Sequence, residues 1–490
     1  MSNKPCGCPD FERTQEGLSR RAFLGGMLAI GGGLVISETM GLRYAIAATG
    51  DIGADVIITV SMRGGMDGLM AVPILGDPNL ARLRPTISVI DSQALRLDRT
   101  FGLHPNLSTF KSLYDAGELA VIHATGTPVG TRSHFDDQNS LELAAYGNPG
   151  TASGWQNRYL QATGTTSVLS GLAVSDQMPV AMYGDASAMA FASLDDIFLT
   201  DIEADHNTYV DTLKKLHSRS ENHWSHQAIE TLDAVESLKK IKATSSAVVY
   251  PDSGSAERFK MLASLINAGV PIKTASIDFD GEFDVHSSAG VRGGTMANNF
   301  SDLSATIAAF KADLGPRWKR VTIVTLTEFG RRLEENASAG VDHGWASAMF
   351  VMGGGVKGGQ VITKWPGLAP EELNDGDLAV TTDYRHVLAE VLMNRGGLSS
   401  EAISAVLPSF RPTPLDFTHP IDLTGVTPAT PVPTRASPTP TRASPTPTRA
   451  SPTPTRASPT PTRASPTPTA SGRPKQKLRL PVRKKKLSKK

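Results

Sequence analysis

The feature that most constrains the fold is an alternation of short apolar runs with amphipathic stretches across the middle of the chain. The apolar runs predict buried β-strands at residues 55–60, 119–123, 273–279, 321–327 and 349–352. Helical patterns lie between or after them, at residues 136–145, 208–242, 256–268, 299–314 and 384–394. Strands that are separated by helices form largely parallel sheets covered on both faces. The sequence therefore predicts a doubly wound α/β fold, whose chemistry gathers at the carboxyl ends of the strands.

The N-terminus carries an export pattern. Arg20 and Arg21 precede Phe-Leu and an apolar, Gly-rich run at residues 25–36, which is shorter than the roughly 20 residues of a membrane span. Ala45-Ile46-Ala47 has the small-x-small pattern of a cleavage site. We predict a twin-arginine signal peptide at residues 1–47, read by the twin-arginine translocase, and a mature protein in the periplasm or at the cell surface. The alternative is an ordinary buried helix with two adjacent arginines.

Both cysteines of the chain lie in this predicted signal. Cys6 and Cys8 would be removed with it, so the mature protein would have no disulfide and no thiolate chemistry. A Cys-x-Cys pair supplies two metal ligands, which is an incomplete site.

The C-terminal part has a different composition. From Thr427 the chain repeats Thr-Arg-Ala-Ser-Pro-Thr-Pro, and its last residues, from Arg473 on, include ten Lys or Arg. Dense proline favours a stiff, solvated polyproline II spacer, which we place at residues 416–471, followed by a basic tail at 472–490. We expect the tail to bind an anionic envelope polymer or lipid head groups. The alternative is a disordered tail without a partner.

Residues 1–422 and the residues that follow them differ in the sign of their net charge. Fifteen Lys or Arg and no acidic residue follow Asp422, so the overall formal charge of +1 leaves −14 for residues 1–422. An acidic body of this kind argues against a nucleic-acid-binding fold.

Candidate functional residues follow the predicted strands. Asp67 stands in a Gly-rich turn after the first strand, where it either points into a cleft or caps a turn. Thr131, Arg132, Ser133 and His134 precede a helix start, whose free N–H groups favour an anion. The alternative for Ser133 is a helix cap.

Carboxylates and histidines follow the later strands. The third strand leads into four carboxylates and one imidazole within nine residues, including Asp284 and His286. Glu328 ends the fourth strand, and Asp342 and His343 precede the fifth. Carboxylate oxygens and imidazole nitrogens suit zinc, manganese or calcium. Together these residues predict a metal-assisted hydrolase-like site. For His104 and His123 we expect a packed or capping role.

Motifs at the same positions carry a family resemblance, and they read in order along residues 55–410. They are Arg-Gly-Gly-x-Asp-Gly-Leu at 63–69, Phe-Gly-Leu-His-Pro at 101–105, Arg-Ser-His-Phe-Asp at 132–136, Gly-Trp-x-Asn-Arg-Tyr-Leu at 154–160, Asp-x-His at 284–286, Thr-Glu-Phe-Gly-Arg-Arg at 327–332, Asp-His-Gly at 342–344, Gly-Gly-Gly-Val-x-Gly-Gly at 353–359 and Val-Thr-Thr-Asp-Tyr-Arg at 380–385. The chain resembles the bacterial DUF1501 family, a domain of unknown function, which we place at residues 48–415.

That family in turn resembles the alkaline phosphatase and sulfatase superfamily. The resemblance implies that Asp67, the pair Asp284 and His286, Glu328 and His343 are metal ligands. It implies that Ser133 or Thr131 is the nucleophile. The chain departs from the superfamily where Glu328-Phe329 replaces an Asp-His pair and where Asp284 and His286 are unusually close in sequence.

Two functions follow as expectations. As an enzyme, the protein would hydrolyse a small phosphate or sulfate ester, with Ser133 or Thr131 attacking. Arg132 or Arg331 would steady the ester oxygens, and His343 or His134 would serve the leaving group. As a non-catalytic envelope or surface protein, it would keep a degenerate site and act through its basic tail.

Overall fold

The computed structural model describes residues 55–421, except for 149, 166, 195–202, 220–222 and 242–245. The chain divides into two units, Met1–Val432 and Pro433–Lys490, and all described residues belong to the first. The predicted signal peptide, the repeats and the basic tail lie outside the described residues. Among the helices that are described, none is long and apolar enough to cross a membrane.

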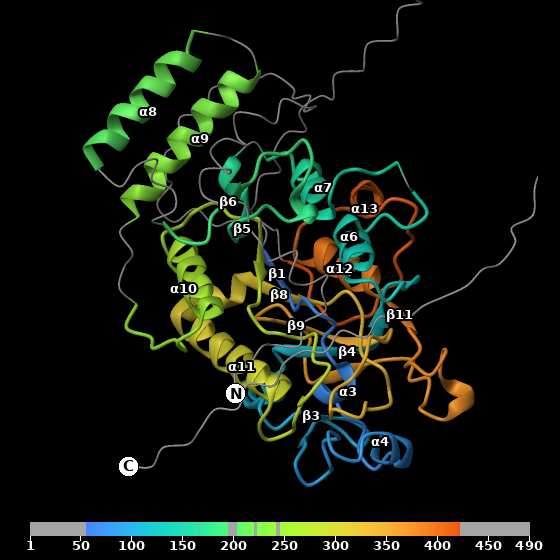
Figure 1. Ribbon diagram of the computed structural model, residues 1–490. Coiled ribbons are helices and arrows are strands. Elements are labelled where there is room, and N and C mark those ends of the chain that lie inside the picture. Colours follow the sequence, from blue (N-terminus) through green and yellow to red (C-terminus); the bar gives the residue numbers. More distant parts are fainter. Residues whose placement is uncertain are drawn as a thin grey trace, which may run out of the picture. The chain divides into compact units, whose positions relative to one another are not determined.

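A nine-stranded sheet forms the centre of the fold (Figure 1). Its path is β10-β4-β9-β8-β1-β7-β5-β6, and β11 also pairs with β4. The strands are β1 (Val56–Ser61), β4 (Leu119–Gly126), β5 (Gly171–Val174), β6 (Met189–Ala190), β7 (Thr274–Asp278), β8 (Val321–Leu326), β9 (Ser347–Gly353), β10 (Gln360–Ile362) and β11 (Thr382–Asp383). The pairings are parallel except that β9 runs antiparallel to β4 and β8. The predicted α/β class with a largely parallel sheet is confirmed.

Helices cover both faces of the sheet (Figure 1). They are α3 (Gly68–Ala71), α4 (Pro78–Leu83), α5 (Ser108–Asp115), α6 (His134–Leu143), α7 (Trp155–Ala162), α8 (Glu203–His217), α9 (His223–Lys240), α10 (Gly254–Asn267), α11 (Thr295–Leu314), α12 (Tyr384–Asn394) and α13 (Ser400–Val406). Short 3₁₀ turns (η1, Val168–Ser170; η2, Val180–Met182; η4, Gly315–Arg320; η5, Pro370–Glu372) and a small ribbon of β2 (Leu95–Arg96) and β3 (Gly102–Leu103) complete the described elements.

Alternation along the strands divides the core into two layers. In β1, Val56, Ile58 and Val60 join the apolar cluster that includes side chains of α10 and α11. Ile57 joins the other cluster, with side chains of α7 and α12. Successive strand side chains point to opposite faces, so a strand with apolar side chains on both faces requires a helical layer on each side.

Two elements differ from the predicted pattern. The amphipathic stretch predicted as one helix at 208–242 is two helices, α8 and α9, which pack side by side (Figure 1). Lys214 of α8 pairs with Asp233 of α9 at 2.8 Å, an ion pair that holds them together. The strand predicted at 349–352 forms β9, the one strand of the described sheet that runs against its neighbours.

The folded body continues past the predicted boundary at residue 415. The buried carboxylate of Glu390 on α12 accepts hydrogen bonds from the N–H groups of Leu415, Asp416, Phe417 and Thr418. The Phe417 ring is fully buried. Residues 415–418 are therefore part of the domain rather than of the spacer.

Candidate metal centre

The candidate site lies where several strands of the sheet end. His134 is the first residue of α6, shortly after β4, and Asp284 and His286 follow β7. Glu328 follows β8, and His343 lies in the loop before β9. Because parallel strands end at the same edge of a sheet, residues distant in sequence meet there.

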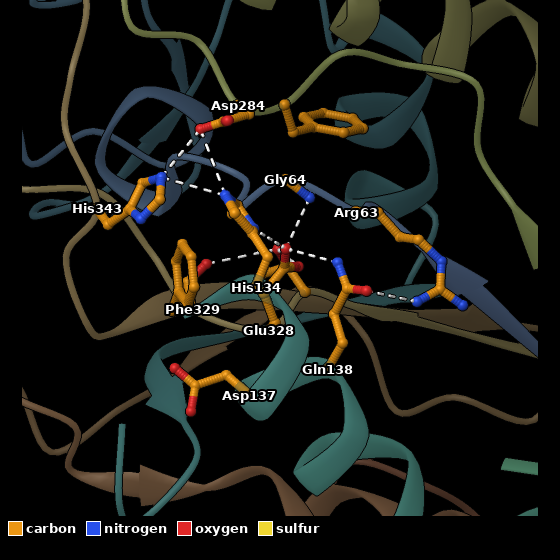
Figure 2. Close-up of polar contacts among 12 residues, drawn as sticks. Arg63, Gly64, His134, Asp137, Gln138, Asp284, Glu328, Phe329 and His343 are labelled. Atoms are coloured by element: carbon orange, nitrogen blue, oxygen red, sulfur yellow. Dashed lines mark hydrogen bonds and ion pairs between the residues drawn. The ribbon is translucent and has the colours of Figure 1, made fainter. Parts of the chain in front are cut away.

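Three side chains form a compact group of possible metal ligands: His134, Asp284 and His343 (Figure 2). Nε2 of His343 lies 3.1 Å from Oδ1 of Asp284 and 3.1 Å from Nε2 of His134. The distance from Nε2 of His134 to Oδ1 of Asp284 is 3.5 Å. Ligand atoms around a tetrahedral zinc, with bonds of about 2.0–2.1 Å, are separated by roughly 3.3 Å. One cation could thus contact all three.

The imidazole of His286 also contacts Asp284. Nε2 of His286 lies 2.9 Å from Oδ1 of Asp284 and 3.2 Å from Nε2 of His343. Its Nδ1 lies 2.9 Å from Oδ1 of Asp342, and that oxygen also accepts a hydrogen bond from the Asn336 amide at 3.2 Å.

The outer nitrogen of each imidazole faces an acceptor. Nδ1 of His134 lies 2.6 Å from Oε1 of Glu328, and Nδ1 of His343 lies 2.9 Å from the carbonyl oxygen of Arg132. Since carboxylates and carbonyls only accept, each Nδ1 carries a proton and donates it. A metal bound at the Nε2 atoms would find the rings held in the orientation that metal-binding histidines show.

Glu328 is positioned by its own hydrogen bonds. Its Oε1 accepts from the N–H of Gly64 at 2.8 Å and from the amide of Gln138 at 3.0 Å, besides contacting His134 (Figure 2). Gly64 has φ +106, and a Cβ there would lie 2.5 Å from the backbone nitrogen of Asp284. Glycine is therefore required at position 64, because only glycine lets the chain approach both residues closely.

The pKa values reflect this crowding. Burial disfavours the charged form of His134, but hydrogen bonds to Asp284 and Glu328 outweigh it and raise the pKa of His134 to about 9. Burial acts against ionised Asp284 too, yet its contacts with His134, His286 and His343 hold the pKa of that carboxyl well below its usual range. For Glu328, burial is again the largest effect, and the bonds from His134 and Gln138 overcome it, lowering the pKa to about 2.

One oxygen of the central carboxylate has no partner. Oδ2 of Asp284 is buried and makes no hydrogen bond. A buried acceptor without a partner is costly, and it marks a place where a further ligand fits. The donor set of imidazole nitrogens and carboxylate oxygen suits zinc or manganese.

Arg331 holds Asp284 from the buried side. Its guanidinium donates to Oδ1 of Asp284 at 2.7 Å and to the carbonyl of Phe283 at 3.0 Å. It also donates to the carbonyls of Gly64, Gly65 and Val341. The side chain is fully buried, so the structure places Arg331 as a support of the carboxylate rather than as a group open to an ester.

The structure does not bring Asp67 into the cluster. Oδ1 of Asp67 accepts from the N–H groups of Leu69 and Met70 and caps α3. Oδ2 pairs with the buried guanidinium of Arg84 at 2.7 Å. Both oxygens are engaged, in the turn and cap arrangement that was the alternative to a metal role.

The segment before α6 is hydrogen-bonded to side chains of the same segment and of α6. Ser133 caps the helix, with its hydroxyl 3.5 Å from the N–H of Asp136, and the hydroxyl of Thr131 accepts from the N–H of Ser133 at 3.1 Å. The N–H groups of Thr131 and Arg132 both bond to the buried carboxylate of Asp137. The anion expected at this helix start is therefore supplied in part by the chain itself.

Arg132 departs from ordinary backbone geometry. Its φ is +60, a left-handed conformation that is costly for a residue with a side chain. Its guanidinium pairs with Asp375 and with the buried Asp377.

Three groups of the site were not predicted from the sequence: Asp137, Gln138 and the carbonyl of Arg132. The carbonyl carries no sequence signal, and Asp137 could be suspected only as a carboxylate one helical turn from His134.

The model of a protein family described as "Protein of unknown function (DUF1501)" matches residues 54–399. The chain belongs to the DUF1501 family. No curated protein matches this DUF1501 chain significantly.

Solved structures resemble the DUF1501 chain distantly. The C-terminal periplasmic domain of EcEptC from Escherichia coli, in complex with zinc, is 12% identical, with a TM-score of 0.34, and the match covers 74% of this chain and 88% of that one. The lipoteichoic acid synthase LtaP from Listeria monocytogenes is 12% identical, with a TM-score of 0.29 and coverages of 67% and 74%. The PsFucS1 sulfatase from Pseudoalteromonas sp. is 10% identical, with a TM-score of 0.29 and coverages of 63% and 64%.

Proposed function

We propose that the domain is a metal-dependent hydrolase of phosphate or sulfate esters, with one divalent metal held by His134, Asp284 and His343. The observation that carries the proposal is the orientation of the imidazoles. Each ring has its outer nitrogen on an acceptor and its Nε2 near one carboxylate oxygen. Three protein ligands leave a coordination position open, as in catalytic zinc sites.

His286 lies beside the three proposed ligands and is the most exposed imidazole of the group, with 25% of its side chain accessible. Asp342 orients it from Nδ1, as a carboxylate orients the histidine of a hydrolytic triad. We assign His286 as the general acid and base, and the hydroxyl of Ser133, next to His134, as the nucleophile. A bound divalent metal would supply polarisation of the ester oxygen.

A second function is favoured by the short contacts of His286 itself. If His286 is a fourth ligand, the site is closed, which is typical of structural metals. The domain would then be a non-catalytic envelope or surface protein.

Metal analysis and activity separate the two functions. We would measure zinc, manganese and calcium in the cleaved, folded protein and assay a panel of aryl phosphates and sulfates. For the hydrolase, we expect about one metal per chain, lost in His343→Ala, and activity lost with metal retained in His286→Ala. Loss of metal in His286→Ala, together with a wild-type protein that hydrolyses none of the esters, supports the structural site. A wild-type protein that is free of metal and inert to the panel would overturn the hydrolase and the structural metal site, and would support a non-catalytic protein with a degenerate site.

The termini support a proposal about location. The twin-arginine pattern would direct the folded protein across the membrane, and the basic tail would hold it at an anionic polymer or lipid surface. Arg20→Lys with Arg21→Lys should leave uncleaved precursor inside the cell. A peptide of residues 472–490 should bind anionic vesicles in a salt-sensitive manner, and binding equal to that of neutral vesicles would contradict the proposal.

A further inference from the structure

We infer that Asp137 is a positioning residue for the metal ligand His343, acting through the backbone carbonyl of Arg132. The inference rests on the proposed metal site, because it explains how one of its ligands is oriented. Asp137 itself faces away from the ligand group in Figure 2, on the same first turns of α6 as His134.

The carboxylate of Asp137 binds the backbone of the loop that precedes α6. Asp137 is 1% exposed, and its oxygens accept from the N–H of Thr131 at 3.0 and 3.1 Å and from the N–H of Arg132 at 2.9 Å. Two successive N–H groups on one carboxylate fix the orientation of both peptide planes, as in an anion-binding nest.

The same loop contacts the imidazole of His343. With φ +60, Arg132 turns the chain sharply, and its carbonyl oxygen lies 2.9 Å from Nδ1 of His343. A strained backbone conformation persists only where surrounding contacts hold it. Here the contacts are the hydrogen bond to Asp137 and the ion pairs of the guanidinium with Asp375 and Asp377.

The consequence is a fixed orientation of the His343 ring. As long as the Arg132 carbonyl is in place, Nδ1 of His343 donates its proton to it, and the ring is held with Nε2 facing Asp284. Outer partners of this kind change metal affinity about 10–100-fold when removed. Glu328 and Asp342 act on their histidines directly, whereas Asp137 acts one peptide further out, so we expect the lower end of that range.

The matched control is Asp136, which precedes Asp137 on the same helical turn and is exposed. We would compare Asp137→Ala, Asp137→Asn and Asp136→Ala in the mature protein, with folding checked by circular dichroism. One readout is the hydrogen-bonded Nδ1–H of His343, from ¹⁵N NMR of the imidazoles in metal-free protein. The other is zinc affinity by competition with a chromophoric chelator.

In Asp137→Ala we expect loss of the hydrogen-bonded Nδ1–H signal of His343 and about 10-fold weaker zinc binding. Asp136→Ala should match the wild type, and Asp137→Asn, whose amide oxygen still accepts hydrogen bonds, should recover part of the effect. An unchanged Nδ1–H signal of His343 and an unchanged zinc affinity in folded Asp137→Ala would overturn the inference. If Asp137→Ala does not fold, Asp137→Asn with wild-type values in both readouts overturns it.

Failure of the metal site is distinguishable from failure of this inference. A wild-type protein that does not bind zinc refutes the proposed function, while the comparison of the His343 Nδ1–H signal in metal-free protein still tests the role of Asp137.

Discussion

Nδ1 of His134 lies 2.6 Å from Oε1 of Glu328, and this contact decides which nitrogen of the ring faces Asp284. Glu328 was expected to be a metal ligand itself. Its position behind His134, fixed by Gly64 and Gln138, suits the orientation of a ligand better than direct coordination.

Glu328→Ala should weaken zinc binding about 10–100-fold, because the His134 ring loses the acceptor that orients it. Competition with a chromophoric chelator measures the affinity. Glu334→Ala, an exposed glutamate close in sequence, is the control and should bind zinc normally. Wild-type affinity in Glu328→Ala would show that His134 needs no such partner.

Zinc should stabilise the folded domain against urea by about 2.7 kcal/mol at a free zinc concentration 100 times the dissociation constant. His134→Ala should lose most of this gain, because one ligand is removed. His419→Ala, which alters an exposed histidine, should keep it. The free energy of unfolding with zinc and with a chelator gives the comparison, and an equal gain in His134→Ala would exclude His134 as a ligand.

Asp67→Ala should destabilise the domain by about 3–5 kcal/mol, because it leaves the guanidinium of Arg84 buried without its counter-ion. Since Asp67 caps α3 and pairs with Arg84, the metal content of the variant that remains folded should equal that of the wild type. Urea unfolding and metal analysis of the same samples test both statements. Loss of metal with little loss of stability would restore Asp67 as a ligand.

The domain should lose stability in acid through His123. The ring is fully buried, with Nε2 facing the carbonyl of Val72 and Nδ1 accepting from the N–H of Ala124. Burial, the largest effect, lowers the pKa of His123 to about 4 from the ordinary 6.5. A depressed histidine pKa means that the folded state resists protonation, so stability is complete above pH 6.5 and falls as the pH drops toward 4.

The expected loss from His123 is about 3 kcal/mol at most, from 1.36 kcal/mol per pKa unit. His123→Gln keeps a donor and an acceptor but does not titrate, so its unfolding free energy should vary less between pH 6.5 and 4. Urea titrations at several pH values measure this. A curve parallel to the wild type would mean that His104, whose pKa burial also lowers to about 4, or other groups dominate.

The strands could be predicted from sequence because their signal is local. Residues 56–61 (Val-Ile-Ile-Thr-Val-Ser) and 321–326 (Val-Thr-Ile-Val-Thr-Leu) consist mostly of β-branched residues without charges, and such runs favour strands buried on both faces. The direction of β9 could not be predicted, since strand direction depends on which neighbours it meets. The break between α8 and α9 was missed because both helices are amphipathic and continue the same pattern.

The site was predicted as a set of residues, and the structure assigned their positions. His134, Asp284, His286 and His343 do meet, because they follow strands that end at one edge. Asp67 also follows such a strand, but Arg84 and the first N–H groups of α3 engage its carboxylate. The ion pair of Asp67 with Arg84 could not be predicted, because no sequence pattern relates the two residues.

Short contiguous patterns encode the α/β class, the edge of the sheet where acidic and imidazole groups gather, and the family, so all three could be predicted from the sequence. The fold assigns which groups point inward as ligands, which orient them from outside, and which form ion pairs elsewhere. These roles depend on directions and distances of 2.6–3.5 Å between residues far apart in the chain, and hydrogen bonds and coordination are sensitive to both.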